Sequence, residues 1–263
     1  MAETISRRIW VLEEGQARQE RENLPRERPF TIQVRAGRER RNATETTRTP
    51  GHDYELAAGL LYSQGYIRSR HDFSHMTYCV QEAGRQEYSL LTVALYAARM
   101  PALPRPEEVV IDGNSCGVSS DNLLAALGAR APESLPAGPV LPVRALAAQA
   151  SEVPVGAAFF DAAGELQVAR QDVRPLQALD KVIGWALLEE RLPLGPGVLW
   201  LPGPADYAMM ERAVLAGAPL VGSRGRPGSL AVSAAHRHGI TLFAVRDDEV
   251  WLYTGRERVT AGS

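Results

Sequence analysis

Hydrophobic and polar positions follow two different periods in the first third of this chain. Residues 29–36 alternate with period two, which predicts a strand, and the polar residues 38–49 predict a second strand turning back from it. Residues 52–67 carry apolar positions at helical spacing, with Asp53 as the expected N-cap and Gly65 as the expected stop. Residues 72–81 and 86–97 predict two more strands. The pattern therefore indicates a small α+β unit.

The second half of the chain alternates strand-like and helix-like segments. A strand, an Ala-Gly turn and a second strand are expected within 155–173, and residues 175–192 predict an amphipathic helix with Pro175 in its first turn. Strands and helices then alternate to residue 255, which predicts a three-layer α/β domain. The proline-rich stretch 100–108 is the best candidate for a linker between these two parts of the chain. We therefore expect a mobile tail at 1–24, an α+β subdomain at 25–105 and an α/β domain at 106–263.

Composition and charge narrow the class of protein. The 263 residues are 45% hydrophobic and 23% charged, as in an ordinary soluble globular protein, and the net charge is only −2. Neither the composition nor the net charge of the whole chain therefore indicates binding to nucleic acid or to a membrane. No apolar run approaches the roughly 18 residues that a membrane span needs. The charged N-terminus lacks an apolar signal core, so we expect a cytoplasmic protein.

The stretch Asp-Gly-Asn-Ser-Cys-Gly-Val-Ser-Ser holds one of only two cysteines, Cys116. A helix through Leu127 is expected to begin just after it, capped by Ser119 or a neighbour, and a helix N-terminus lowers a thiol pKa. Cys116 is thus either a reactive thiol or a turn cysteine without a role. Cys79, in a predicted strand, is expected to be a small buried hydrophobe. Ser119 excludes a Cys-x-x-Cys pair, and no metal site is predicted.

The loop between a predicted strand and a predicted helix at 219–239 is a second candidate. Arg224, Arg226 and the helix start at Ser229 would suit a phosphate or another anion, although a solvated basic turn fits equally well. His236 and His238 are spaced wrongly for a helical metal pair. Asp172, Asp180 and Lys181 surround the entry to the helix at 175–192, where they either line a pocket or cap and solvate the helix.

Several motifs resemble the FdhD/NarQ family, the formate dehydrogenase accessory sulfurtransferases, from about Glu27 to Val259. Ser-Cys-Gly-Val-Ser-Ser is similar to the family's Ser-Ser-Cys-Gly-x-Cys-Gly, with Cys116 on the first cysteine. Other matching residues lie in the opening strand, in the following helix and in the helix at 175–192. They are Glu27, Pro29, Ile32, Thr49, Pro50, Asp53, Ala58, Gly59, Leu61, Gly65, Ile67, Asp172, Val173, Ala178, Asp180, Lys181 and Gly184.

The cysteine loop and three further polar segments depart from the family pattern. Ser119 stands in place of the second loop cysteine, and Val155 stands in place of a histidine. The helix entry Gly-Arg-His-Asn is here Arg-Pro-Leu-Gln at 174–177, and a Ser-Gly-Arg segment is Pro-Gly-Pro at 202–204. These changes leave open whether sulfur transfer is retained.

The resemblance implies a cytidine-deaminase-like three-layer α/β domain with a smaller N-terminal α+β portion, usually in a homodimer. It implies a sulfur carrier: a cysteine desulfurase would pass a persulfide sulfur to Cys116, for delivery to the molybdenum bis(molybdopterin guanine dinucleotide) cofactor of formate dehydrogenase. No structural metal is implied. The cofactor-contacting segment would fall on Phe243, Ala244, Val245, Arg246, Asp247 and Asp248, with Arg224, Arg226 and Ser229 offering an anion site.

Two alternative functions differ from that of a sulfur carrier. A non-catalytic family member could bind a nucleotide-like cofactor or a partner enzyme without transferring sulfur, and the altered segments favour that alternative. The retained Cys116 favours the carrier, a sulfurtransferase with a cysteine persulfide intermediate. A nucleoside deaminase is excluded, because its zinc-binding cysteines and catalytic glutamate motif are absent.

Overall fold

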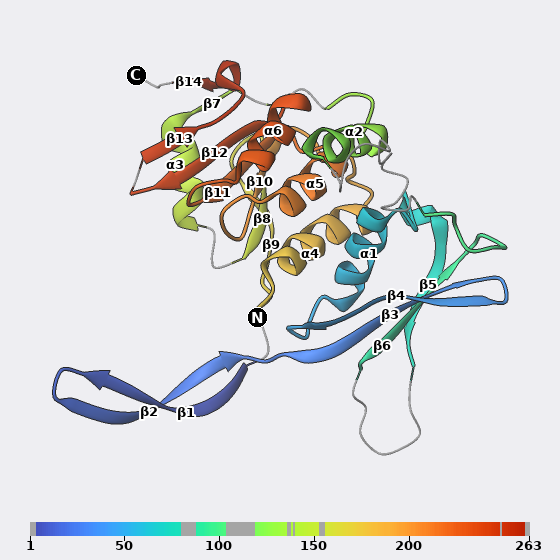
Figure 1. Ribbon diagram of the computed structural model, residues 1–263, viewed down its shortest axis with the longest axis horizontal. Coiled ribbons are helices and arrows are strands. Elements are labelled where there is room, and N and C mark those ends of the chain that lie inside the picture. Colours follow the sequence, from blue (N-terminus) through green and yellow to red (C-terminus); the bar gives the residue numbers. More distant parts are fainter. Residues whose placement is uncertain are drawn as a thin grey trace.

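The computed structural model describes residues 4–79, 88–103, 119–135, 138, 140–152, 156–247 and 249–260. Figure 1 shows a hairpin arm, a four-stranded sheet with one helix, and a six-stranded sheet between helices. The predicted positions Cys116, Val155 and Asp248 lie outside the described residues, as does the predicted turn at Ala83 and Gly84.

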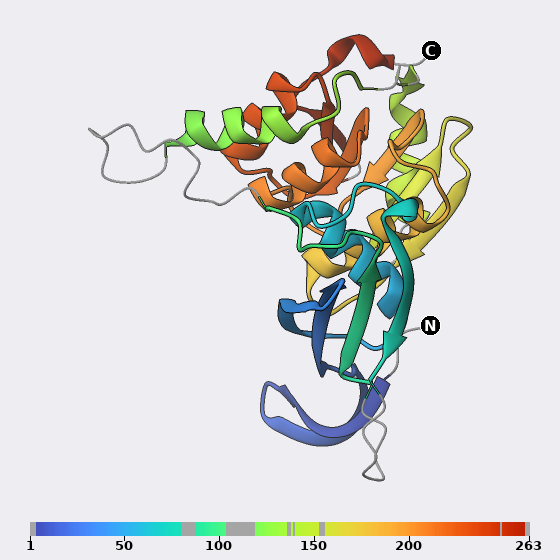
Figure 2. The ribbon, with the colours of Figure 1, turned by 90° about the vertical axis from the view of Figure 1, so that its right-hand side faces the viewer.

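The N-terminal residues, for which a mobile tail was expected, form a paired hairpin. β1 (Thr4–Glu13) pairs antiparallel with β2 (Gln16–Pro25), and Gly15 supplies the positive φ, 79°, that the turn requires. Ile5, Ile9 and Val11 alternate with polar residues, a period-two pattern that the charged composition of this segment masks. The arm extends away from the rest of the molecule in both views (Figures 1 and 2).

The four-stranded sheet has the order β4-β3-β6-β5 and is covered by α1 (Asp53–Gln64). The predicted strands are confirmed as β3 (Arg28–Ala36), β4 (Glu39–Arg48), β5 (Phe73–Tyr78) and β6 (Leu90–Leu95). Every second residue of β3 is buried, as the alternation predicted. Gly65 ends α1 in the left-handed conformation, as expected, but the N-cap is His52 rather than Asp53.

Cys79 is exposed, so the prediction that it is a buried hydrophobe is wrong. It follows the last residue of β5, an edge strand of the four-stranded sheet, and its backbone N–H donates to the carbonyl of Leu90. The side chain therefore lies at the end of a sheet edge and outside the core.

The six-stranded sheet has the order β13-β12-β11-β10-β8-β9. The three central strands are parallel, whereas β8, β9 and β13 run antiparallel to their neighbours. Its strands are β8 (Ala157–Asp161), β9 (Leu166–Arg170), β10 (Gly197–Trp200), β11 (Leu220–Arg224), β12 (Thr241–Arg246) and β13 (Glu249–Leu252).

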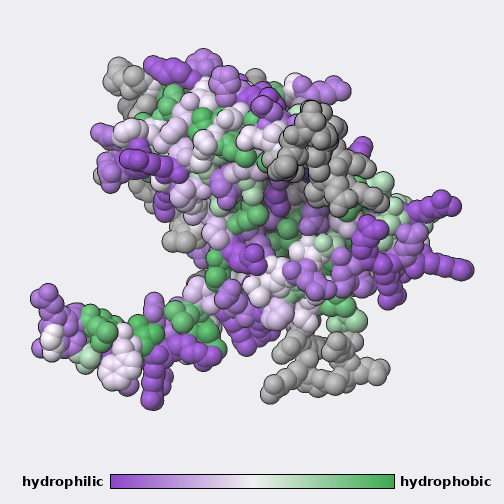
Figure 3. Space-filling view, viewed as in Figure 1, coloured by the Kyte–Doolittle hydropathy of each residue, from purple (hydrophilic) through white to green (hydrophobic). Residues whose placement is uncertain are grey.

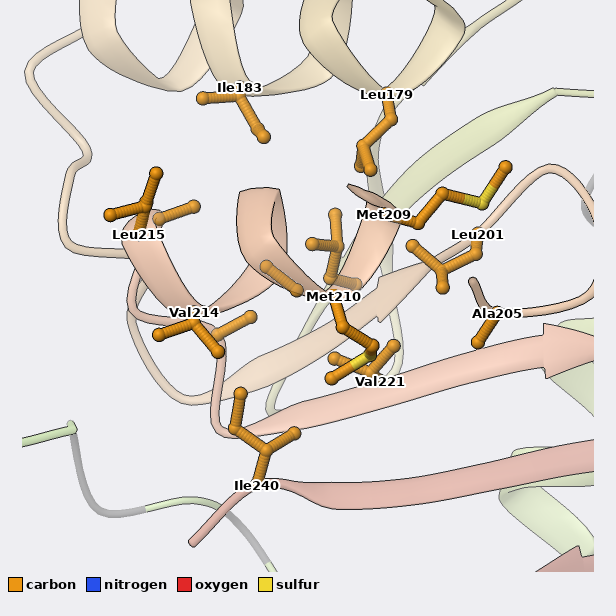
Figure 4. Close-up of a cluster of buried hydrophobic side chains, with 14 of the residues drawn as sticks. Leu179, Ile183, Leu201, Ala205, Met209, Met210, Val214, Leu215, Val221 and Ile240 are labelled. Atoms are coloured by element: carbon orange, nitrogen blue, oxygen red, sulfur yellow. The ribbon is translucent and has the colours of Figure 1, made fainter. Parts of the chain in front are cut away.

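Helices cover both faces of this sheet, so the predicted three layers are confirmed. Leu199 packs with α2, α4, α5 and α6, whereas its neighbours Val198 and Trp200 pack on the opposite face with α3. Figure 4 shows side chains of α4 and α5 meeting on the first face. None of the described helices is long and apolar enough to cross a membrane. The helices are α2 (Ser120–Arg130), α3 (Val143–Glu152), α4 (Pro175–Leu188), α5 (Tyr207–Leu215) and α6 (Ser229–Arg237).

Short elements complete the described chain. Strand β14 (Val259–Thr260) pairs parallel with β7 (Leu141–Pro142) beside α3. Two 3-10 helices, η1 (Arg70–Asp72) and η3 (Arg256–Arg258), precede β5 and β14.

The two sheets are joined where α1 and α4 cross with their backbones in contact. A Cβ atom on Gly59 would lie 1.9 Å from the carbonyl oxygen of Asp180, and one on Gly184 would lie 1.7 Å from that of Glu55. Only glycine fits at these two positions. Leu187 of α4 also belongs to the buried cluster of the four-stranded sheet, so one helix contributes to both cores.

We expect Gly184→Ala to lower the free energy of unfolding by at least about 1–3 kcal/mol, because the added methyl group forces α1 and α4 apart. Chemical denaturation followed by circular dichroism measures the change. Gly195→Ala is the matched control, since nothing lies within 4 Å of a Cβ at that position. The control should stay within about 0.5 kcal/mol of wild type. Equal stability of both variants would contradict the close helix contact.

Candidate functional site

Two of the segments predicted to bind an anion meet at one edge of the six-stranded sheet. β11 and β12 are parallel neighbours, with Ser223 opposite Ala244 and Arg224 opposite Val245. Their carboxyl ends therefore lie side by side, and this edge is where open α/β sheets commonly bind ligands. The pairing brings together segments that are separated in sequence by the whole of α6.

The loop from Arg224 to Ser229 forms one side of this edge. Arg224, Arg226 and Ser229 are exposed, and α6 begins after Gly228 without a side-chain cap. Gly225 has a positive φ of 78°, and the backbone N–H of Gly228 donates to the carbonyl of Ala205. The first turn of α6 therefore offers backbone N–H groups and the positive end of its dipole to an anion.

The segment at the end of β12 divides into buried and accessible residues. Phe243 and Ala244 are fully buried, and the Phe243 ring packs against Trp200 at 5.7 Å between centroids. Arg246 lies over the Trp251 ring at 3.8 Å, and its Nε atom has no hydrogen-bond partner among the described residues. Asp247 is exposed. Asp247 is thus the exposed residue of this segment, Arg246 is half-buried against Trp251, and Phe243 lies in the core.

The helix expected after Cys116 is present. α2 begins at Ser120, and the Ser119 hydroxyl accepts a hydrogen bond from the backbone N–H of Asn122 at 3.2 Å. Ser119, in the place of the family's second cysteine, therefore caps this helix.

A cavity of about 590 Å³ lies between α2, α6 and the segment after β13. It is lined by Asp121, Leu124, Val232, Ser233, His236, Arg237, Tyr253 and Thr254.

Among the described residues, neither His236 nor His238 belongs to a cluster of three or more histidine, cysteine, aspartate or glutamate side chains that could hold a metal ion. His238 is partly buried at the end of α6, and its Nε2 atom has no partner there. Burial is the main cause that lowers the pKa of His238, and the charge of Arg237 acts in the same direction.

Asp172 and Lys181 form a buried ion pair that ties the subdomain contact together. Lys181 Nζ lies 2.8 Å from Asp172 Oδ2, and the two side chains are 1% and 0% exposed. Lys181 also donates to the carbonyl of Thr49 at 2.9 Å, and the Thr49 N–H donates to Asp172 at 3.2 Å. Asp172 Oδ1 also accepts from the backbone N–H of Arg174, at the entry to α4, at 3.0 Å. These charges therefore join the loop before α1 to the entry of α4.

The altered helix entry also contacts the N-terminal sheet. Arg174 Nη1 and Gln177 Nε2 both donate to the hydroxyl of Thr46 in β4, at 3.2 and 2.7 Å. Arg174 and Gln177, two residues of the segment that departs from the family pattern, thus join the start of α4 to the four-stranded sheet.

Asp180 is completely buried in α4, beside the contact with α1. Its Oδ1 atom lies 3.4 Å from both Arg212 Nε and Ser63 Oγ, whereas Oδ2 has no partner in the described chain. Burial raises the pKa of Asp180 to about 6, against the opposing effects of Arg212 and Ser63. At lower pH the side chain is therefore a neutral acid.

A cleft at the start of α1 could not be predicted from the sequence. Tyr54 of α1, Tyr78 of β5 and Tyr88, just before β6, gather there together with the buried Arg48. These tyrosines form no motif in the sequence, and they meet only because α1 packs on the four-stranded sheet.

Comparison with known proteins places these features in a family. Residues 25–260 match the FdhD/NarQ family. The chain is 37% identical to the sulfur carrier protein FdhD of Mycolicibacterium paratuberculosis, over 98% of this chain and 100% of that protein. It is 33% identical to the protein of the same name from Nocardia farcinica, over 99% and 96%.

A solved structure has the same fold as this chain. It is the crystal structure of a protein from Desulfotalea psychrophila that is described as a formate dehydrogenase accessory protein. The TM-score is 0.74 at 22% sequence identity, and the match covers 98% of this chain and 99% of the other. The mixed α/β architecture is thus shared over the full length.

We expect the raised pKa of Asp180 to make stability depend on pH. Between about pH 4 and pH 6 the folded chain holds a proton that the unfolded chain, with a carboxyl pKa of 3.8, has lost. This group's contribution to the free energy of unfolding therefore falls as pH rises through that window and stays low above it.

Asp180→Asn cannot titrate, so its stability relative to wild type should rise between pH 4 and pH 6, by on the order of 2 kcal/mol, and level off above pH 6. Urea denaturation of both proteins from pH 4 to pH 8 measures the difference. A difference that is constant across this range would contradict the buried, protonated state.

Proposed function

Because the chain belongs to the FdhD/NarQ family, we propose that it is a sulfur carrier protein, with a persulfide on Cys116, that serves formate dehydrogenase. The observation that carries the proposal is the full-length likeness to proteins named sulfur carrier protein FdhD, combined with the retained loop cysteine. The capped helix that follows this cysteine supports an activated thiol, since a helix N-terminus stabilises a thiolate.

The loading step needs only one cysteine. The Cys116 thiolate attacks the terminal sulfur of a persulfide on a cysteine desulfurase, and a new S–S bond forms. The bond between that sulfur and the donor cysteine breaks, and the donor cysteine leaves as a thiolate. A second cysteine would serve to release the sulfur by attack on the first. Ser119 cannot do this, so release falls to an outside acceptor.

The sheet edge is the site for the molybdenum bis(molybdopterin guanine dinucleotide) substrate. Its phosphates require cations and N–H donors, which Arg224, Arg226 and the first turn of α6 supply. The guanidinium of Arg246 adds a further positive charge beside this edge. Val245 is half-buried, Asp247 is exposed, and Asp248 continues the segment beyond the described residues.

The finer features of fold and assembly belong to the same proposal. The domain at 106–263 is cytidine-deaminase-like, supported by its mixed sheet between two helical layers. The chain works in the cytoplasm, where a reducing environment keeps thiols free.

The working assembly is a homodimer, which the N-terminal arm supports. An isolated two-stranded hairpin is at best marginally stable, and Trp10 and Leu12 are 63% and 75% exposed on this one. Figure 3 shows apolar side chains along the projecting arm. A second copy that covers them would stabilise the arm.

Intact-mass spectrometry after incubation with a cysteine desulfurase and cysteine tests the proposal. We expect wild type and Cys79→Ala to gain one sulfur atom, and Cys116→Ala to gain none. Cys79 is the necessary control, because its exposed thiol can also accept sulfur. A gain that follows Cys79, or no gain, would contradict the carrier function.

Mass spectra recorded under native conditions give the oligomeric state. Twice the chain mass supports the homodimer, and a single chain mass contradicts it.

A further inference from the structure

A second cavity, of about 710 Å³, lies at the start of α1, between this helix and the four-stranded sheet. This volume is within the range of small-molecule sites. The cavity is lined by residues of the N-terminal subdomain and by Leu188 at the end of α4, and it shares no lining residue with the sheet edge. It is lined by Arg28, Arg48, Pro50, Gly51, His52, Asp53, Tyr54, Glu55, Tyr78, Tyr88 and Leu188.

One part of this cavity is built for an anion. The N-cap of α1, His52, makes no side-chain capping bond, so backbone N–H groups of the first turn lack a side-chain acceptor. Arg48 is 2% exposed and holds Asp53 with Nε and Nη2, at 3.0 and 2.6 Å. Its remaining nitrogen, Nη1, has no hydrogen-bond partner in the described chain. A buried guanidinium nitrogen without an acceptor is costly, and an anion would satisfy it.

The acidic residues nearby do not cancel this positive character. Asp53 accepts from Arg48 and from the Tyr78 hydroxyl, at 2.8 Å for the latter. Glu55 is held by Arg170, with one contact at 2.7 Å. Partial burial is the main cause that lowers the pKa of His52, and its Nδ1 atom lies 3.2 Å from Glu55 Oε2, so the imidazole is a second partner of Glu55. Both carboxylates thus already have partners within the protein.

The other part of the cavity is aromatic. The Tyr78 ring lies 5.6 Å from that of Tyr54 and 4.9 Å from that of Tyr88, between ring centroids. Tyr78 is fixed by its bond to Asp53, while Tyr54 and Tyr88 are 45% and 47% exposed. Half-exposed rings beside a fixed one offer a surface on which a flat ring system can stack.

We propose that this cleft binds a planar heteroaromatic phosphate of the nucleoside monophosphate class. The phosphate lies at the start of α1 near Arg48, and the ring system lies against Tyr54 and Tyr88. Stacking on tyrosine does not discriminate between bases, so the site selects the combination of ring and phosphate. The inference does not depend on sulfur transfer at Cys116, and its failure would leave that function untouched.

Isothermal titration calorimetry of the full chain with adenosine 5′-monophosphate tests the cleft. Wild type should bind it, with adenosine and inorganic phosphate each at least about tenfold weaker, because each lacks one of the two recognised groups. Tyr54→Ala and Tyr88→Ala should each weaken binding roughly fivefold or more. Both side chains are half exposed, so these variants should fold.

Two variants serve as matched controls and should bind like wild type. Tyr96→Ala removes a tyrosine that is 72% exposed and lies outside the cavity, and Arg226→Ala alters the sheet edge. The proposal is overturned if wild type shows no binding at millimolar nucleotide, if both cleft variants bind like wild type, or if adenosine binds as tightly as its monophosphate. Loss of binding in Arg226→Ala alone would place the ligand at the sheet edge and equally overturn it.

Discussion

The structure depends on the contact between α1 and α4, where two helix backbones meet without side chains between them. Gly59 and Gly184 make the contact possible, since a single Cβ at either position would overlap a carbonyl oxygen of the other helix. Such close approach excludes water from everything beside it. The buried charges at this contact must therefore be paired within the protein, and Lys181 with Asp172 and Arg48 with Asp53 meet that requirement.

This contact relates the functional parts of the molecule to one another. α4 packs on one face of the six-stranded sheet, whose parallel strands end at the loop of Arg224 and Arg226. α1 packs on the four-stranded sheet and presents its uncapped N-terminus to the tyrosine cleft. A change at the helix contact would therefore shift the cleft relative to the sheet edge, although neither site contains Gly59 or Gly184.

Local patterns in the sequence were sufficient to predict most elements of the fold. The alternation in β3 and the Pro175 start of α4 are signals that involve only neighbouring residues, and both are confirmed. The full N-terminal hairpin was not predicted, because the charged residues of β1 and β2 conceal a period-two pattern. Cys79 was misjudged because burial depends on where a strand ends and which strands flank it, and no local pattern records that.

The candidate site was predictable only where one motif contains it. The loop at 224–229 could be predicted as a candidate anion site, and its approach to the end of β12 depends on the parallel pairing of β11 and β12. The cleft could not be predicted, because the segment that holds Arg48 and Tyr54 meets Tyr78 and Tyr88 only in the folded chain. Likewise, the hydrogen bonds of Arg174 and Gln177 to Thr46 depend on how the subdomains pack.

Differential scanning calorimetry of the wild-type chain tests most directly whether the α1–α4 contact joins the two sheets into one unit. The account predicts a single transition, with equal calorimetric and van't Hoff enthalpies, because the sheets share buried residues and paired charges across this contact. Two separate transitions, or a calorimetric enthalpy well above the van't Hoff value, would show that the sheets unfold independently and would contradict it.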